Sequence, residues 1–357
     1  MFWGKKKPST LAEAVENLIA LQEGTFDPKQ FQQACVEVTQ QGMKADKSQR
    51  DQALAQLKTP IEQSASLPAA LIALVCGALV EQDADGMVVL DTILTRAAPI
   101  LREAAAFAAY CHAKGQDKNP GAEDNSEINF LERYGAEVAP EHPNEAMAWD
   151  ALDVIYMPLI AMLSQSSQAR RMAKQHERYA PALETYINTA PISHGGADWL
   201  WKMQQVLDDE ELLVIHRGEG KGFKVRIGGI ADNFHLHDLL AQNLIGNPTE
   251  GLLSGQVHNG GEGVWDLVNW TGLHTSSDEA NNWSKAEHWI WGEGVPADIK
   301  SFEGVRVVLL EPSSYVRTWD PSQNSFCNMQ ATLEVQEVLS PDVVQDYLKR
   351  MTQAASN

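Results

Sequence analysis

The residues best suited to chemistry lie between Asp232 and Asp238, where the sequence reads DNFHLHD. Two imidazoles bind one zinc ion only if both reach the same point, and Asp238 would then be a third ligand or would orient a histidine. On a strand, His235 and His237 would share a face, whereas on a helix they would point about 200° apart. The leucines that follow have a helical spacing, which favours a helix with the two histidines flanking an apolar stripe.

The zinc interpretation nevertheless defines an alternative function. In it the chain is a metal-assisted hydrolase that uses His235, His237, Asp238 and a histidine from further along the chain. A catalytic zinc needs about three protein ligands and an open position. The further histidines in this region are His258, His274 and His288, and no spacing distinguishes among them.

Tryptophan and histidine are concentrated in one part of the chain. Eight of the ten tryptophans lie between Trp199 and Trp319, and seven of the ten histidines lie between His194 and His288. Tryptophan offers a large rigid surface with one polar atom, which suits pockets and interfaces. The candidate binding residues are therefore Trp265, Trp270, His274, Trp283, His288, Trp289 and Trp291.

Two alternatives remain for this tryptophan-rich segment. With Asp266 and Glu287 among the rings, it could line a sugar or small-ligand cleft, where a carboxylate pair could serve glycoside hydrolysis. It could also be a loop whose tryptophans only pack into the core.

Other catalytic patterns are incomplete. The glycine-rich stretch Arg217–Gly222 lacks the Lys-Ser/Thr ending and the following helix of a phosphate loop, so it predicts a hairpin turn. Ser254 stands one position away from the place of a nucleophile in Gly251–Gly255. The four cysteines form no CxxC pair, which favours buried free thiols and a reducing compartment.

The charge of the chain points to the kind of partner it can have. The formal net charge is −20, and residues 190–357 hold 23 acidic against 11 basic side chains. A phosphate backbone must be neutralised by Lys and Arg, so a nucleic-acid partner is not expected. A basic surface on another protein is compatible with this charge, and simple solubility is the alternative explanation.

Export and membrane insertion are not expected. The lysines at Lys5–Lys7 are followed by Pro8 and polar residues, not by the apolar run of a secretory signal. The longest apolar stretch, Leu67–Val80, is shorter than a membrane-spanning helix. We therefore expect a cytoplasmic protein.

The N-terminal half is predicted to be helical. Apolar periodicity and capping residues predict successive helices. Their expected ranges are 10–21, 28–41, 47–57, 68–82, 87–96, 97–113, 144–162, 167–179, 181–189 and 196–207. Pro60 is expected to end the helix at 47–57, and Pro99 to separate the helices at 87–96 and 97–113. Pro158 is expected to kink or divide the helix at 144–162.

Beyond about residue 211 the pattern changes to alternating strands and helices. The ranges 212–215 and 223–227 predict a hairpin. A helix capped by Asp232 or Asn233 follows, and strands are expected at 305–310 and 330–339 before a terminal helix at 343–351. Residues 246–300 lack clear periodicity, and a segment of that length inside a domain is usually functional.

The sequence as a whole predicts an α+β protein of two domains. Residues 1–190 are expected to form an all-helical scaffold, either a bundle or a stack of HEAT-like helical hairpins. Residues 191–357 are expected to form a Trp- and His-rich α+β domain with a small, mostly antiparallel sheet. The expected function is non-enzymatic binding of a protein with a basic surface, with no cofactor. A narrower form is an immunity-like protein that protects against a basic effector enzyme.

Overall fold

The computed structural model describes residues 10–22, 27–118, 130–257, 261–274, 288–320, 326 and 328–356. The chain divides into two compact units, Met1–Gln204 and Gln205–Asn357. The first unit is helical and the second combines a sheet with helices, so the predicted α+β class is confirmed. The first unit extends past residue 190, because the helix Gly195–Gln204 belongs to it.

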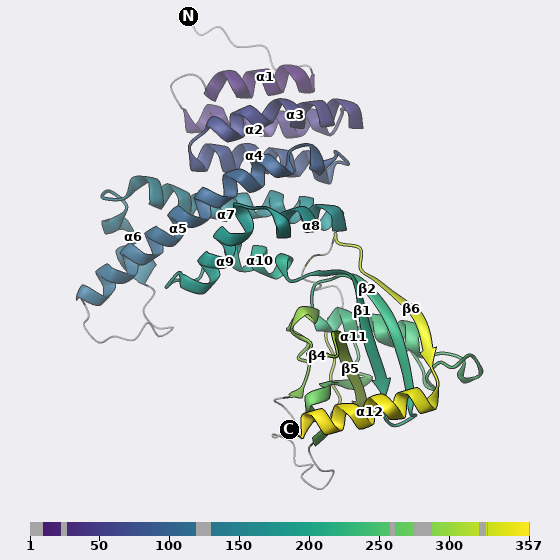
Figure 1. Ribbon diagram of the computed structural model, residues 1–357. Coiled ribbons are helices and arrows are strands. Elements are labelled where there is room, and N and C mark those ends of the chain that lie inside the picture. Colours follow the sequence, from purple (N-terminus) through teal and green to yellow (C-terminus); the bar gives the residue numbers. More distant parts are fainter. Residues whose placement is uncertain are drawn as a thin grey trace, which may run out of the picture. The chain divides into compact units, whose positions relative to one another are not determined.

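The first unit is a stack of helices (Figure 1). Its helices are α1 (Leu11–Gln22), α2 (Pro28–Gly42), α3 (Lys47–Gln63), α4 (Ser66–Glu81), α5 (Leu90–Lys118), α6 (Phe130–Val138), α7 (Pro143–Gln165), α8 (Ser167–Gln175), α9 (Tyr179–Thr189) and α10 (Gly195–Gln204), with a 3₁₀ turn, η1 (Gly86–Val88), before α5.

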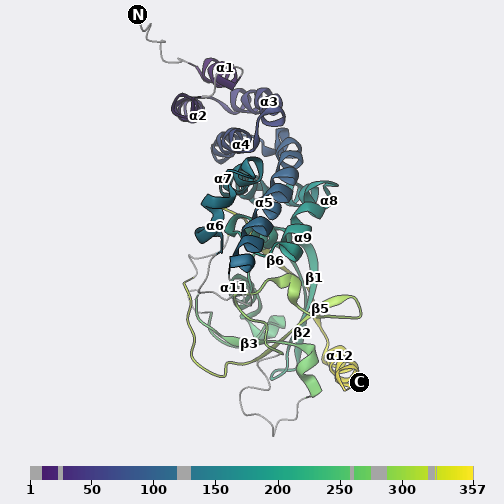
Figure 2. The same ribbon diagram turned by 90° about the vertical axis from the view of Figure 1, so that its left-hand side faces the viewer.

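The first helices of this unit form two rows. Helices α1, α3 and α5 contact one another in turn, and so do α2, α4 and α7 (Figure 2). Cross-contacts between α1 and α2, α3 and α4, and α5 and α7 join the rows. This nearest-neighbour pattern is that of stacked helical hairpins, one of the two arrangements that the sequence left open.

Two apolar helices, α4 and α7, pack against each other near the middle of the stack. They approach closely at Gly77, where a Cβ atom would lie 2.8 Å from the Cα of Pro158. Helix α7 is also long and apolar enough to cross a membrane by length and composition, but half of its most apolar stretch is buried inside the unit. A core helix of a soluble protein has the same character.

The predictions for the prolines of this unit were wrong in detail. Helix α3 continues past Pro60 to Gln63, and α5 runs unbroken through Pro99. Helix α7 is not divided at Pro158, and a kink there, the other outcome expected, stays a prediction. A proline inside a helix removes one backbone hydrogen bond. Around Pro99 the side chains of Ala97, Ala98, Ile100 and Leu101 are fully buried, and this packing outweighs the lost bond.

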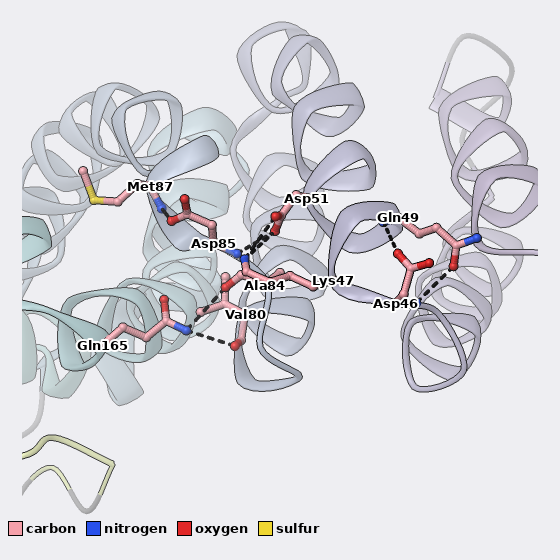
Figure 3. Close-up of polar contacts among 9 residues, drawn as sticks. All are labelled: Asp46, Lys47, Gln49, Asp51, Val80, Ala84, Asp85, Met87 and Gln165. Carbon is pink, nitrogen blue, oxygen red and sulfur yellow. Dashed lines mark hydrogen bonds and ion pairs between the residues drawn. The ribbon is translucent and has the colours of Figure 1, made fainter.

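Side chains at the turns hold neighbouring hairpins together (Figure 3). Asp51 on α3 accepts a hydrogen bond from the Asp85 N–H at 2.7 Å and pairs with the Lys47 ammonium at 3.0 Å. On the other row, the Gln165 amide donates to the carbonyls of Val80 (3.1 Å) and Ala84 (3.5 Å) at the end of α4. These contacts satisfy backbone groups that a helix end leaves unpaired.

The second unit is built on a mixed sheet with strand order β3-β5-β1-β2-β6, and the short β4 pairs with β5. Strands β1 and β5 are parallel and the other pairings are antiparallel, as predicted for a mostly antiparallel sheet. The strands are β1 (Leu207–His216), β2 (Lys221–Ile230), β3 (Trp265–Asn269), β4 (Ser301–Phe302), β5 (Val305–Pro312) and β6 (Thr332–Leu339). Helices α11 (Asn233–Leu244) and α12 (Pro341–Ala355) and the 3₁₀ turns η2 (Pro248–Glu250), η3 (Trp270–His274) and η6 (Pro296–Asp298) complete the unit.

One helix covers each face of this sheet. Leu212 of β1 packs in a cluster with Leu236 of α11, whereas the next residue, Leu213, packs in a cluster with Val344 of α12. Successive strand residues point to opposite faces, so the two clusters lie on the two sides of the sheet. The hairpin of β1 and β2 confirms the prediction, with Gly220 in its turn at φ +62°.

We predict that Asp51→Ala destabilises the helical unit by about 1 kcal/mol, because it leaves the Asp85 N–H without its acceptor. The effect should depend on pH. Partial burial raises the pKa of Asp51, whereas the hydrogen bond from the Asp85 N–H and the Lys47 cation lower it. The lowering effects are larger together, so the pKa of Asp51 lies below its usual value. The stabilisation is therefore present above the unfolded-state pKa of about 4 and is lost as the pH falls below it.

Urea unfolding of the wild type and of Asp51→Ala at pH 7 and at pH 3 measures the contribution of Asp51 to stability. The two proteins should differ at pH 7 and converge at pH 3. Glu62→Ala, an exposed acid on the same helix, is the matched control and should behave as wild type at both values. An Asp51→Ala deficit that is equal at both pH values would contradict the assignment.

Candidate binding surface

The DNFHLHD segment forms the start of α11, so His235 and His237 stand on a helix, as the leucine spacing indicated. The Asp232 carboxylate caps this helix by accepting a hydrogen bond from the His235 N–H at 2.9 Å. A side-chain oxygen at this position satisfies a backbone donor that the first helical turn cannot pair. The two imidazoles therefore leave the helix in different directions.

His237 is a buried hydrogen-bond acceptor. Its Nε2 accepts the backbone N–H groups of Val264 and Trp265, both at 3.2 Å. Because both partners are donors, the neutral ring carries its proton on Nδ1. Burial, with a smaller contribution from the Arg317 cation, lowers the pKa of His237 to about 4. The imidazole is therefore neutral at pH 7 and joins the beginning of β3 to α11.

Asp238 also joins α11 to distant parts of the chain. Its carboxylate accepts a hydrogen bond from the Gly261 N–H at 3.4 Å and another from the Trp319 indole N–H at 3.3 Å. Burial raises the pKa of Asp238. The oxygen atoms that a metal would need are thus used to bind backbone and indole donors.

Within the described residues, no group of three or more His, Cys, Asp or Glu side chains is placed to hold a metal ion. The lone pair of His237 Nε2 is occupied by two N–H groups, and its Nδ1 lies 4.0 Å from Asp238 Oδ1. His258 and Glu287 lie outside the described residues. The zinc site and the hydrolase alternative remain predictions without support from the described geometry.

The candidate binding residues do not form one cluster. Trp265 is a core residue on β3 with 4% of its surface exposed. Trp270 is half-buried in η3, where its indole N–H donates to the Ser301 carbonyl at 3.1 Å and its ring packs edge-on against Phe302. His288 is half-buried, with Nδ1 3.2 Å from Thr271 Oγ1. Trp283 and the side chain of His274 lie outside the described residues.

An exposed group of aromatic rings surrounds the remaining two tryptophans. The Trp289 ring is half-buried, and its centroid lies 5.2 Å from that of Trp291 and 6.1 Å from that of Tyr315. Trp291 is 51% exposed, Tyr315 is 49% exposed, and the adjacent Val316 is 97% exposed. We refer to Trp289, Trp291, Tyr315 and Val316 as the aromatic patch.

The N-terminus of α11 fixes one side of the aromatic patch. The N–H groups of Asn233 and Phe234 both donate to the Gly292 carbonyl at 3.0 Å. The Asn233 side-chain amide donates to the Trp291 carbonyl at 2.9 Å. The N–H groups in the first turn of a helix have no intrahelical acceptor, and here they bind the backbone at and after Trp291.

The sheet and Arg317 hold the other parts of the aromatic patch in place. Ile290 donates its N–H to the Leu267 carbonyl at 2.8 Å, and Trp289 forms an isolated antiparallel β-bridge with Val268 on the edge strand β3. The Arg317 guanidinium lies 5.6 Å from the centre of the Tyr315 ring and 3.1 Å from the Asp266 carboxylate. Buried Asp266 thus positions an arginine that stacks on the patch.

Sequence reasoning missed Tyr315, Val316, Arg317 and the role of Asn233. The first three follow β5 in the stretch PSSYVRTW, whose run of polar and aromatic residues was one available signal. The packing of this stretch against Trp289 depends on the pairing of β3 with β5, which no local pattern reveals.

No protein-family model matches this chain, and neither the curated proteins nor the solved structures provide a match.

We predict that His237→Ala destabilises the second unit by about 1–3 kcal/mol at pH 7, because two buried N–H groups lose their acceptor. In the wild type, stability should fall as the pH drops from about 6.5 towards 4. Over that range the unfolded imidazole takes up a proton that the folded one excludes.

His237→Gln keeps an acceptor but cannot titrate, so it should regain part of the stability and lose most of this pH dependence. Thermal unfolding between pH 7.5 and pH 4.5 makes the comparison. A His237→Gln profile as steep as that of the wild type would show that His237 is not the titrating group.

Proposed function

We propose that this protein is a non-catalytic binding protein that attaches to a partner protein with a basic surface through the aromatic patch. The observation that carries this proposal is the exposure of Trp291 and Tyr315 on either side of Trp289, on a backbone held by α11.

The residue types of the patch support a protein partner. Trp, Tyr and Arg are the residues most enriched among those that dominate binding energy. The patch contains Trp289, Trp291 and Tyr315, and Arg317 stacks on it. Hydrogen bonds from Asn233 and Phe234 hold the backbone at and after Trp291, so we expect little conformational entropy to be lost on binding. The rings pack on one another with centroids 5.2 and 6.1 Å apart, which favours a surface contact over a small-ligand cage.

The charge of the unit supports a basic partner. Residues 190–357 hold 23 acidic against 11 basic side chains, and exposed Glu293 lies two residues after Trp291. Opposite fields speed encounter and select among partners. In the narrower form of the proposal, the partner is a basic effector enzyme that this protein masks, as an immunity protein does; the charge balance is what supports it.

We predict that Trp291→Ala and Tyr315→Ala each reduce partner capture at least tenfold, which corresponds to about 1.4 kcal/mol or more for a central aromatic contact. Immobilised full-length protein is incubated with extract of its native cells, and bound proteins are quantified by mass spectrometry. The specific partner is the protein retained in near-stoichiometric amount, and its retention should weaken as salt is raised.

The matched control is Trp199→Ala, which removes a tryptophan of similar exposure (41%) from α10 in the other unit. It should retain the partner fully. Recovery of no stoichiometric protein by the wild type, or equal losses in all three variants, would count against a role for the aromatic patch.

Asn233→Ala tests whether α11 presents the patch. Asn233 does not belong to the patch, but its side chain holds the Trp291 carbonyl. We predict a several-fold loss of partner capture, together with a red shift of tryptophan emission as the Trp291 segment loosens. Unchanged capture with unchanged emission would show that this hydrogen bond does not position Trp291.

A further inference from the structure

A second surface of the protein lies on the helical unit and is independent of the aromatic patch. Helices α2, α4 and α7, which form one row of the stack, leave a groove of about 510 Å³ between them. Its walls are formed mainly by apolar side chains, among them Val36 on α2, Leu74 and Ala78 on α4, and Met157 on α7. This volume lies within the range of natural ligand sites, about 300–1,000 Å³.

The sequence of α4 shows that this groove is not an ordinary solvated surface. The helix is apolar on all sides, and such a helix is normally enclosed on all sides. One face packs inside the unit, but Leu71, Leu74 and Ala78 remain only half-buried and line the groove. Val36 and Met157 on the walls are 43% and 40% exposed. An apolar strip of this kind is typical of a surface that a partner covers.

The charge of the groove indicates what covers it. Among the described residues that line it, Glu81 carries the only charge, and none is a lysine or arginine. In the part of the chain that the structure describes, Glu81 has no ion-pair partner. The groove is therefore mainly apolar, with the uncharged polar residues Gln32, Thr39 and Gln40 on its α2 wall, and it is acidic at the C-terminal end of α4. It is complementary to an apolar face with a basic residue at its edge.

We propose that the groove binds an amphipathic helix of a partner protein that carries lysine or arginine beside its apolar face. Such helices place apolar anchors at positions i, i+3 or i+4, and i+7 in a groove of this type. Packed helices lie about 8–10 Å apart, so three in a row span about 16–20 Å, the length of a helix of about 11–13 residues. The exposed Met157 suits this role, since its flexible thioether adapts to different partner side chains.

The test uses a phage-displayed library of helical peptides of about 13 residues, selected against the full-length protein. The enriched peptides should carry the i, i+3 or i+4, i+7 apolar pattern with a flanking Lys or Arg. Their affinities are then measured by fluorescence anisotropy against the wild type and its variants. Failure to enrich any helical peptide, or enrichment of acidic ones, overturns the proposal.

Two substitutions in the groove probe the site. Ala78→Trp fills the groove with a bulky ring, and Val36→Lys adds a cation to an exposed wall position with little risk to folding. Each should weaken the peptide about tenfold or more. Met43→Lys changes another exposed apolar residue at the end of α2 that does not line the groove, and it should stay within about twofold of wild type. Equal binding by wild type, Ala78→Trp and Val36→Lys overturns the proposal.

Glu81→Gln tests the charge. It should weaken a peptide with a flanking Lys about threefold at low salt, and it should not affect the same peptide with Gln in place of that Lys. Trp291→Ala should leave peptide affinity unchanged, and Ala78→Trp should leave partner capture by the aromatic patch unchanged. Failure of the groove proposal and failure of the aromatic-patch proposal therefore give different results.

Other occupants of the groove would give distinct results. A second copy of the chain would appear as a concentration-dependent dimer in light scattering that Ala78→Trp abolishes. A lipid surface would appear as co-sedimentation with vesicles of neutral or anionic phospholipid that the same variant abolishes. Either result overturns the assignment to a basic amphipathic helix.

Discussion

The second unit depends on how the first turn of α11 satisfies its backbone N–H groups. A helix begins with donors that no intrahelical carbonyl can accept. Here Asp232 takes one of them, and the Gly292 carbonyl takes those of Asn233 and Phe234. The capping requirement of a helix thereby fixes the segment that carries Trp291. His237, one turn further along, similarly fixes the beginning of β3.

Residues that resembled catalytic groups therefore have structural roles in the described geometry. Asp232, His237 and Asp238 are polar, close in sequence and largely buried, which is also the signature of an active site. Each of them, however, accepts hydrogen bonds from backbone or indole donors. Asp232 caps the helix, and His237 and Asp238 tie two distant segments, residues 261–265 and Trp319, to it.

Local patterns in the sequence predicted much of the fold. The cap at Asp232, apolar periodicity and the glycine-rich turn at Arg217–Gly222 are local signals, and the elements that they mark are present. The helices through Pro60 and Pro99 could not be predicted in this way, because burial in the stack outweighs the proline penalty. Strand β3 was also missed, since its pairing with β5 joins residues far apart in the chain.

The candidate site was harder to predict than the fold. Tryptophan content indicated the region that carries the aromatic patch, but it did not separate Trp265, which is enclosed in the core, from Trp291, which is exposed. Tyr315 and Val316 join the patch only through tertiary packing. Burial is a property of the whole fold, whereas composition reports only where large aromatic side chains are available.

The most direct test of the central claim is amide hydrogen exchange of the full-length protein, free and bound to the partner captured from its native cells. Binding through the aromatic patch predicts slower exchange on complex formation in residues 288–294 and 313–319, with little change elsewhere in the second unit. Unchanged exchange in both segments, with protection at another surface of the unit, would contradict the account.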